Sequence, residues 1–130
     1  MKKQSEEKVN KMIVYRRFRF HSARFLPNLR DGHICKQTHG HTFNLTIYIN
    51  GEINSKDGFV IDFFEIDTII KDKILPLIDH KLLNEIKGLE NPTSEHLVKW
   101  IWSKIDNEFK GLHKIKLSED HGTGIIYNGE

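Results

Sequence analysis

Residues 41–50 read HTFNLTIYIN and give the clearest secondary-structure signal in the chain. Apolar side chains occupy every second position of this stretch, at Phe43, Leu45, Ile47 and Ile49. This alternation is typical of a β-strand that buries one face in the core. The Asn50-Gly51 pair that follows indicates a turn. The stretch therefore predicts a strand, and its parity assigns the residues just before it to a face.

The segment before this strand predicts another strand, and the segment after it predicts a helix. Residues 11–23, KMIVYRRFRFHSA, are rich in β-branched and aromatic side chains, with Val14, Phe18 and Phe20 on one side. Asp62 can cap a helix, and after it the apolar residues recur with a helical period: Ile66, Ile69, Ile70, Ile74 and Leu77. Pro76 is expected to end or bend this helix.

The last third of the chain predicts one more helix and two short strands. The helix is expected to begin at Thr93, and its buried face to hold Leu97, Trp100, Ile101, Ile105 and Phe109. Residues 113–119 and 124–129 have the pattern of strands on either side of a glycine-containing turn. The resulting order, β-β-α-α-β-β, predicts an α+β fold in which an antiparallel sheet carries two helices on one face.

The composition is that of an ordinary soluble globular protein of 130 residues. A formal net charge of +2, without a basic block interleaved with aromatics, gives no indication of nucleic-acid binding. The sequence has no run of eighteen apolar residues that would predict a membrane span. A single cysteine excludes an intramolecular disulfide and favours the reducing cytoplasm. We expect residues 1–10 to be a flexible end and residues 11–130 to form one domain.

A histidine pair precedes the clearest strand. His39 and His41 are two residues apart, so both side chains are expected on the face that Phe43 places in the core. Converging imidazoles can hold a zinc ion at about 2.0–2.1 Å. They can equally be partly buried, hydrogen-bonded histidines without a metal. The glycine between them favours a site, because it lets a ligand approach the backbone.

A catalytic zinc site needs a third protein ligand and an open position. His21, on the preceding strand, is the nearest candidate, but it has the opposite parity to Phe18 and Phe20. A bulge or change of phase near Ser22 would turn it to the side of the histidine pair. His33, in the irregular segment between the two strands, is the alternative.

The only cysteine, Cys35, lies in a polar segment four residues before His39. A lone cysteine is usually a small, buried, inert side chain. Beside Lys36 and near an expected cation, however, its thiolate would be stabilised. The residue can therefore be a metal ligand or a general base, and the pattern favours neither.

Two carboxylates complete the set of candidates. Asp79 precedes His80 and can orient its imidazole as in an acid–base relay, or it can cap a turn and leave His80 exposed. Glu119 shares the parity of Ile115 and Leu117, so we expect it to face inward. An unpaired buried carboxylate is costly, so an inward Glu119 requires N–H donors. The other possibility is that a turn exposes it.

Taken together, these segments resemble the 6-pyruvoyl-tetrahydropterin synthase family. The resemblance covers about residues 14–130 in the family's order. It rests on FHSARFLP (20–27), GHICKQTHGHTF (32–43), IDFFEID (61–67), IDHKLLN (78–84), GLENPTSEHLVKWIW (88–102) and IYNGE (126–130). The C-x-x-x-H-G-H spacing is similar to that of the family's carboxypterin-forming branch.

The resemblance implies the tunnelling fold (T-fold), with subunits assembled as trimers, usually stacked as hexamers, and active sites between neighbouring subunits. It implies zinc as the cofactor and a small-molecule pterin triphosphate as the substrate. The implied reaction converts 7,8-dihydroneopterin triphosphate into 6-carboxy-5,6,7,8-tetrahydropterin, a step of queuosine biosynthesis. The alternatives are a related pterin side-chain lyase, such as the pyruvoyl-forming synthase, and a non-catalytic pterin- or metal-binding module.

The resemblance also assigns roles to individual residues. His39 and His41 match two of the family's three zinc ligands, and Cys35 matches the catalytic cysteine. Asp79 and His80 match the relay that works with the cysteine. Glu119 matches the acid that anchors the pterin ring, and the helix start at Thr93 and Ser94 resembles the lining of the pterin pocket.

The sequence departs from the family pattern at two positions. Arg24 stands where the family has its first zinc histidine, so His21, three residues earlier, is expected to be the third ligand. Asp120 stands where the family usually has threonine, and it is expected to repel the substrate's phosphates slightly.

Overall fold

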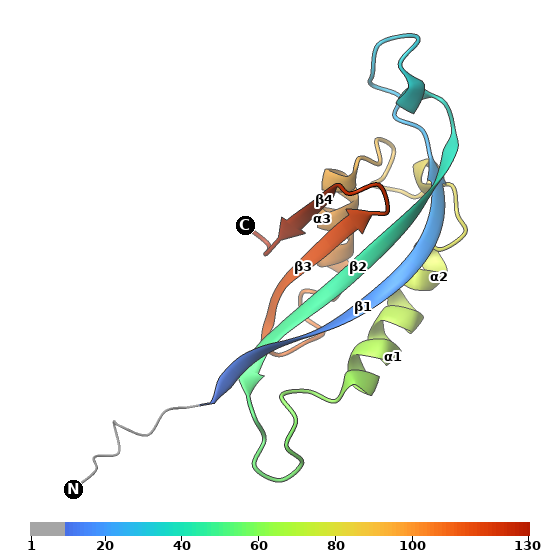
Figure 1. Ribbon diagram of the computed structural model, residues 1–130. Helices are drawn as coiled ribbons and strands as arrows, with labels where there is room; N and C mark the ends of the chain where they lie inside the picture. The colour runs from blue at the N-terminus through green and yellow to red at the C-terminus, as the bar shows by residue number, and fades with distance from the viewer. Residues whose placement is uncertain (1–9) are drawn as a thin grey trace, which may run out of the picture.

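The structure, a computed structural model, describes residues 10–130. The predicted flexible end, residues 1–10, lies outside these residues except for Asn10. The described residues form an antiparallel sheet of four strands in the order β1-β2-β3-β4 (Figure 1). The strands are β1 (Lys11–Arg24), β2 (His39–Glu52), β3 (Leu112–Glu119) and β4 (Gly124–Tyr127).

The helices lie together on one face of this sheet (Figure 1). They are α1 (Phe63–Lys73), the short α2 (Leu75–Ile78) and α3 (Ser94–Ile105). Two single-turn 3₁₀ helices occur in the connections, η2 (Ile34–Lys36) and η3 (Leu83–Glu85). The predicted α+β class and the predicted β-β-α-α-β-β order are confirmed, with α2 as an additional turn.

The helix starts follow from their capping residues. The Asp62 carboxylate accepts the backbone N–H of Phe64 at 2.9 Å, and the Thr93 hydroxyl accepts that of His96 at 3.1 Å. The expected effect of Pro76 is also present, because α1 ends at Lys73 and a separate turn contains the proline. Leu77 lies in that turn and is exposed, so it does not belong to the predicted apolar stripe.

The register of β1 and β2 assigns side chains to the two faces of the sheet. The two strands pair without interruption along 14 residues each. Directly opposite residues of an antiparallel pair share a face. The inner face, which packs on the helices, buries the predicted apolar residues of three strands: Phe18, Phe20, Phe43, Leu45, Ile47, Ile49, Ile115 and Leu117. The same face continues into Ser22 and Arg24, opposite His41 and His39.

Two connections reach the end of the sheet where β1 stops and β2 starts. Residues 25–38, with η2, project beyond the strands (Figure 1). The residues after α2 lie along the edge of β1, where the N–H of His80 donates to the His21 carbonyl at 2.6 Å and that of Ala23 to the Lys81 carbonyl at 2.9 Å. The topology therefore gathers at this end the segments that carry most of the predicted site residues.

Candidate functional site

Glu119 is the centre of a buried polar cluster on the inner face of the sheet. It ends β3 opposite Phe43, and its side chain is only 9% exposed. Oε1 accepts Nη2 of Arg24 at 3.0 Å and Nδ1 of His41 at 2.9 Å, and Oε2 accepts the Ser94 hydroxyl at 3.1 Å. We call these four residues, Arg24, His41, Ser94 and Glu119, the Glu119 cluster. The predicted inward orientation of Glu119 is confirmed, and the N–H donors that it requires come from a guanidinium and an imidazole.

Arg24, the last residue of β1, supplies the cation of this cluster. Its Nη1 donates to the Pro92 carbonyl and to the Ser94 hydroxyl, both at 3.2 Å, and the guanidinium lies 5.3 Å from the centre of the Phe43 ring. Its side chain is 8% exposed, so the ion pair with Glu119 is shielded from water. Burial alone raises the pKa of Glu119, but the Arg24 guanidinium and the Ser94 hydrogen bond hold that pKa below its usual value. Glu119 is therefore a carboxylate near neutral pH.

His39 and His41, the β2 histidine pair, point to the same face as predicted. Their ring centres are 4.2 Å apart. Nδ1 of His39 lies 2.7 Å from the Gln37 carbonyl, to which it donates. Burial and the nearby Arg24 guanidinium lower the pKa of His41, although Glu119 acts in the opposite direction. His41 is therefore neutral near pH 7, with its Nδ1–H donated to Glu119 and its Nε2 buried without a partner among residues 10–130.

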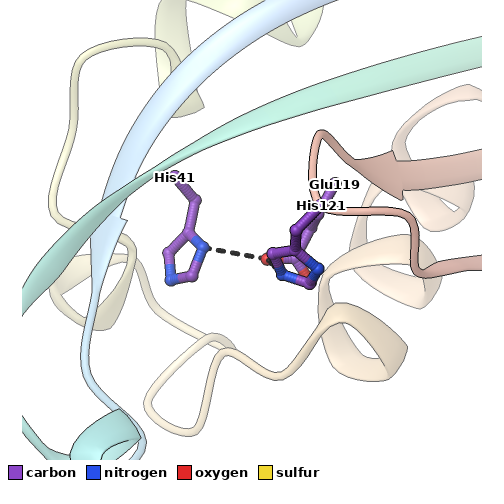
Figure 2. A group of neighbouring side chains, drawn as sticks. All are labelled: His41, Glu119 and His121. Atoms are coloured by element: carbon purple, nitrogen blue, oxygen red, sulfur yellow. Dashed lines mark ion pairs between the residues drawn. The ribbon is translucent and has the colours of Figure 1, made fainter.

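His121 lies in the turn after β3 and approaches the same carboxylate, with Nε2 3.5 Å from Oε1 of Glu119. Figure 2 shows the ion pair between His41 and Glu119, with His121 beside Glu119 at the far end of the dashed line. The donor atoms of these three residues lie within 4.8 Å of one another. Within the described part of the chain, they form the one group of three or more histidine, cysteine or acidic residues close enough to share a metal ion. The chain thus has a possible His/Glu metal site, although His121 is 60% exposed.

His21 does not join the β2 histidine pair. The bulge expected near Ser22 is absent, because the pairing of β1 with β2 is continuous from end to end. His21 lies opposite Thr42, on the outer face, and its Nδ1 is 2.9 Å from the Thr42 hydroxyl. The expected set of His21, His39 and His41 is therefore not assembled within one chain. Arg24 holds the inner-face position expected for the first ligand.

Asp79 and His80 meet His21 at the outer edge of β1, and we call these three residues the Asp79 cluster. One oxygen of Asp79 accepts the backbone N–H of His21 and Nδ1 of His80, both at 3.0 Å. Burial raises the pKa of Asp79, but the hydrogen bonds from His21 and His80 more than compensate and lower it overall. His80 has a φ of +59° and its side chain is 76% exposed. The carboxylate thus orients an imidazole that remains open to solvent.

The other predicted site residues have separate positions. Cys35 is half-buried in η2, where its N–H donates to Nδ1 of His33 at 3.0 Å. Thr93 uses its hydroxyl to cap α3, whereas Ser94 reaches into the Glu119 cluster. Asp120 faces outward and pairs with Arg19 at 3.0 Å. The structure thus brings His41, Ser94 and Glu119 together, and it keeps Cys35 and the Asp79 cluster apart from them.

The sequence interpretation missed two members of this region. Arg24 is not among the predicted site residues, although it shares the parity of Phe18 and Phe20, which places it on the inner face. His121 follows the predicted strand directly, in a turn whose direction no periodicity predicts. A hollow of about 950 Å³ lies at the other end of the sheet, around Asn50, Gly51 and Gly111, and none of the predicted site residues lines it.

No helix in the described part of the chain is both long and apolar enough to cross a membrane.

Comparison with known proteins gives a consistent result. The sequence profile of the family described as 6-pyruvoyl tetrahydropterin synthase matches residues 13–130. The 6-carboxy-5,6,7,8-tetrahydropterin synthase of Synechocystis is 34% identical over 116 residues, which cover 82% of this chain and 85% of that protein. The dihydroneopterin monophosphate aldolase of Pyrococcus furiosus is 37% identical over 81 residues, which cover 62% of this chain and 67% of that protein.

A solved structure supports the same assignment of the fold. The 6-pyruvoyl tetrahydropterin synthase of Caenorhabditis elegans superposes with a TM-score of 0.85 at 20% identity, covering 95% of this chain and 99% of that one. The predicted T-fold is therefore confirmed.

Proposed function

The chain belongs to the 6-pyruvoyl tetrahydropterin synthase family, and from this premise we propose that it is a pterin side-chain lyase. The proposed reaction converts 7,8-dihydroneopterin triphosphate and one water into 6-carboxy-5,6,7,8-tetrahydropterin, with release of acetaldehyde and triphosphate, in queuosine biosynthesis. The similarity to the Synechocystis 6-carboxytetrahydropterin synthase, over most of both chains, favours this product. The spacing of Cys35, His39 and His41 agrees with it.

The observation that carries the proposal is the inward, ionised carboxylate of Glu119. A pterin ring presents N–H donors along one edge, and a carboxylate has about four acceptor sites for such donors. Arg24 and His41 both approach Oε1, so Oε2 is the oxygen that can receive the ring. The Ser94 hydroxyl, which donates to Oε2, can rotate and release it. Glu119 would thus fix the ring and orient the side chain that reacts.

The residues proposed to move protons lie elsewhere. Asp79 holds Nδ1 of His80, which leaves Nε2 of that exposed ring to exchange a proton with the substrate. Cys35, as a thiolate, would remove a proton from the substrate's side chain, and His80 would return protons during the cleavage. Asp79 keeps the imidazole in one tautomer and stabilises its protonated form.

These residues do not face one substrate within a single chain. Glu119 is on the inner face of β3, whereas the Asp79 cluster is on the outer edge of β1, two strand spacings or about 10 Å away. We therefore propose a homo-oligomer, a trimer or a hexamer, with the active site between neighbouring subunits. The edge strand β1 supports association, because it exposes Met12, Ile13 and Tyr15 beside unpaired backbone groups.

Zinc as the cofactor is predicted from the sequence resemblance and stays a prediction. The expected three-histidine site does not fit the structure, because His21 is on the outer face and Arg24, a cation with no acceptor atom, holds the remaining position. The possible site at His41, Glu119 and His121 uses an oxygen that Arg24 already occupies. No proton transfer proposed above passes through a metal.

The experiment that tests the proposal is product identification. Purified protein is incubated with 7,8-dihydroneopterin triphosphate, and the mixture is analysed for acetaldehyde and for the side chain of the pterin. We expect equal amounts of acetaldehyde and the carboxypterin from the wild type, and neither from Cys35→Ala. A product that keeps a pyruvoyl side chain would assign the chain to the other branch. If the substrate is not converted at all, the result would favour a non-catalytic pterin- or metal-binding module.

The cytoplasm is the proposed location, because Cys35 is a free thiol and such residues suit a reducing compartment.

A further inference from the structure

We propose that Arg24 is the resident cation of the inner-face site, taking the place of a divalent ion, so that the β2 histidine pair holds no metal in this chain. The guanidinium would fix Glu119 as a carboxylate and leave Nε2 of His41 free for the substrate. This assignment concerns the charge of the site, and it holds whichever pterin reaction the chain performs.

The first support is position. Arg24 lies directly opposite His39, and Ser22 lies opposite His41, so the arginine shares the face of the β2 histidine pair. Its Nη2 is 3.0 Å from Oε1 of Glu119, while Nδ1 of His41 is 2.9 Å from the same oxygen. A guanidinium remains protonated in proteins and has no lone pair to offer a metal. Where a third imidazole would complete a tetrahedral site, the chain therefore has a donor-only cation.

The second support is charge balance. The Arg24 and Glu119 side chains are 8% and 9% exposed, and their opposite charges compensate each other. Water and salt screen charges poorly at such a site. A divalent ion added on the β2 histidine pair would leave a large net positive charge beside the guanidinium, with no further carboxylate to balance it: the other acidic neighbour, Asp120, faces outward and pairs with Arg19.

The third support is the orientation of His41. Its Nδ1–H is used by Glu119, so Nε2 carries the lone pair, and in Figure 2 that nitrogen lies on the far side of the ring from the carboxylate. Nε2 is buried and has no hydrogen-bond partner among the described residues. A buried acceptor without a partner is costly, so it fits a hydroxyl of the bound substrate.

The test is a zinc titration against a chromophoric competitor, on wild-type protein that was first treated with a chelator. We expect the wild type to bind less than about 0.1 zinc per chain under conditions in which Arg24→His binds one. With three imidazoles on one face, Arg24→His should bind at least about 100-fold more tightly than the wild type. Cobalt should give the intense visible bands of a tetrahedral site in Arg24→His only.

Matched variants identify the ligands. Adding His41→Ala to Arg24→His should abolish the gain in zinc affinity, whereas adding His21→Ala should leave it unchanged. Arg24→Lys keeps the positive charge and should stay metal-free like the wild type. If Arg24→His does not fold, the titrations of the wild type and of Arg24→Lys still decide the question.

One zinc bound tightly by the wild type would overturn the proposal, and its loss on His121→Ala would place the ion at His41, Glu119 and His121. Turnover by the chelator-treated wild type separates the outcomes. If the chelator-treated wild type is active and added zinc does not increase its turnover, the result agrees with Arg24 as the cation of the inner-face site. Absence of activity with and without zinc counts against the proposed function and leaves the metal titration as the test of Arg24.

Discussion

The Glu119 cluster and the Asp79 cluster lie at the same end of β1, the first on the inner face of the sheet and the second at its edge. In the first, a carboxylate, a guanidinium, an imidazole and a hydroxyl contact one another in a place shielded from water. In the second, a carboxylate holds an imidazole that is 76% exposed. The first cluster has most of its hydrogen bonds made within the chain, whereas the second presents a ring that is mostly open to solvent.

The contrast between the buried cluster and the exposed cluster indicates how a small sheet can supply an active site. Alternate residues of β1 go to opposite faces, so Arg24 and His21, three positions apart, are directed to different clusters. The buried face can hold and orient a substrate, because its charges are fixed by neighbours. The exposed edge can exchange protons, because its imidazole is accessible. The four predictions below concern this division, from the largest expected effect to the smallest.

Glu119→Gln should cost about 3–5 kcal/mol of the free energy of unfolding, because it leaves the Arg24 guanidinium buried without its counter-charge. Asp120→Asn, which breaks the exposed pair with Arg19, should cost about 1 kcal/mol or less. Urea denaturation monitored by tryptophan fluorescence measures both values. The double variant Arg24→Met/Glu119→Met should recover most of the loss, because it removes both buried charges. Equal losses for the two single variants would contradict the contrast between the faces.

His80→Asn should lower kcat about 10²–10³-fold, because it removes the proposed proton carrier. It should change the free energy of unfolding by less than about 0.5 kcal/mol, because asparagine tolerates the φ of +59° at this position. His80→Ala is the matched control: it should lose the same activity and about 1 kcal/mol more stability. Steady-state kinetics and urea denaturation provide the two readouts. A His80→Asn variant with full turnover would remove this residue from the mechanism.

Asp79→Asn should reduce the free energy of unfolding by about 1 kcal/mol near pH 7, because it weakens the hydrogen bonds from His21 and His80. The pKa of Asp79 is lower in the folded protein than its ordinary value of 3.8. Its contribution is therefore complete above that value and is lost as the pH falls through the lower, folded-state pKa. The difference between wild type and variant should be constant from pH 7 to about pH 5 and shrink below about pH 4. If the stability difference between wild type and variant grows as the pH falls, the pKa of Asp79 is raised in the folded protein and not lowered.

His21→Ala should have the smallest effect, less than about 0.5 kcal/mol, because the side chain is exposed and its contact is the Thr42 hydroxyl. The backbone groups of His21 that bind Asp79 and His80 remain in the variant. Metal content should be unchanged. A loss of bound metal would show that the residue is a ligand after all, for example through a neighbouring subunit.

Much of the fold was predictable, because it depends on local patterns. The alternation at Phe43, Leu45 and Ile47 predicts β2 and its buried face, and the caps at Asp62 and Thr93 predict where α1 and α3 begin. The inward orientation of Glu119 followed from the same parity. Strand parity is a property of a few neighbouring residues, so a single sequence suffices for it.

The rest of the site depends on contacts between distant segments. That Arg24 pairs with Glu119, 95 residues later, follows from strand order and register, which parity alone does not give. The expectation for His21 required a bulge that the continuous β1–β2 ladder does not contain. The place of His80 beside His21 depends on how residues 78–82 cross the edge of β1.

The central claim is that the Glu119 cluster of one chain and the Asp79 cluster of another form one active site, and subunit mixing tests it most directly. Arg24→Met/Glu119→Met and His80→Asn, each inactive alone, are co-expressed with different tags, and oligomers that carry both tags are isolated. If each site combines clusters from two chains, the doubly tagged oligomers have wild-type clusters at about a third of their sites in a trimer and at about a quarter in a hexamer of two trimers, and the same fraction of wild-type turnover should return. No recovery in the doubly tagged oligomers would contradict the claim and place both clusters at the same chain's site.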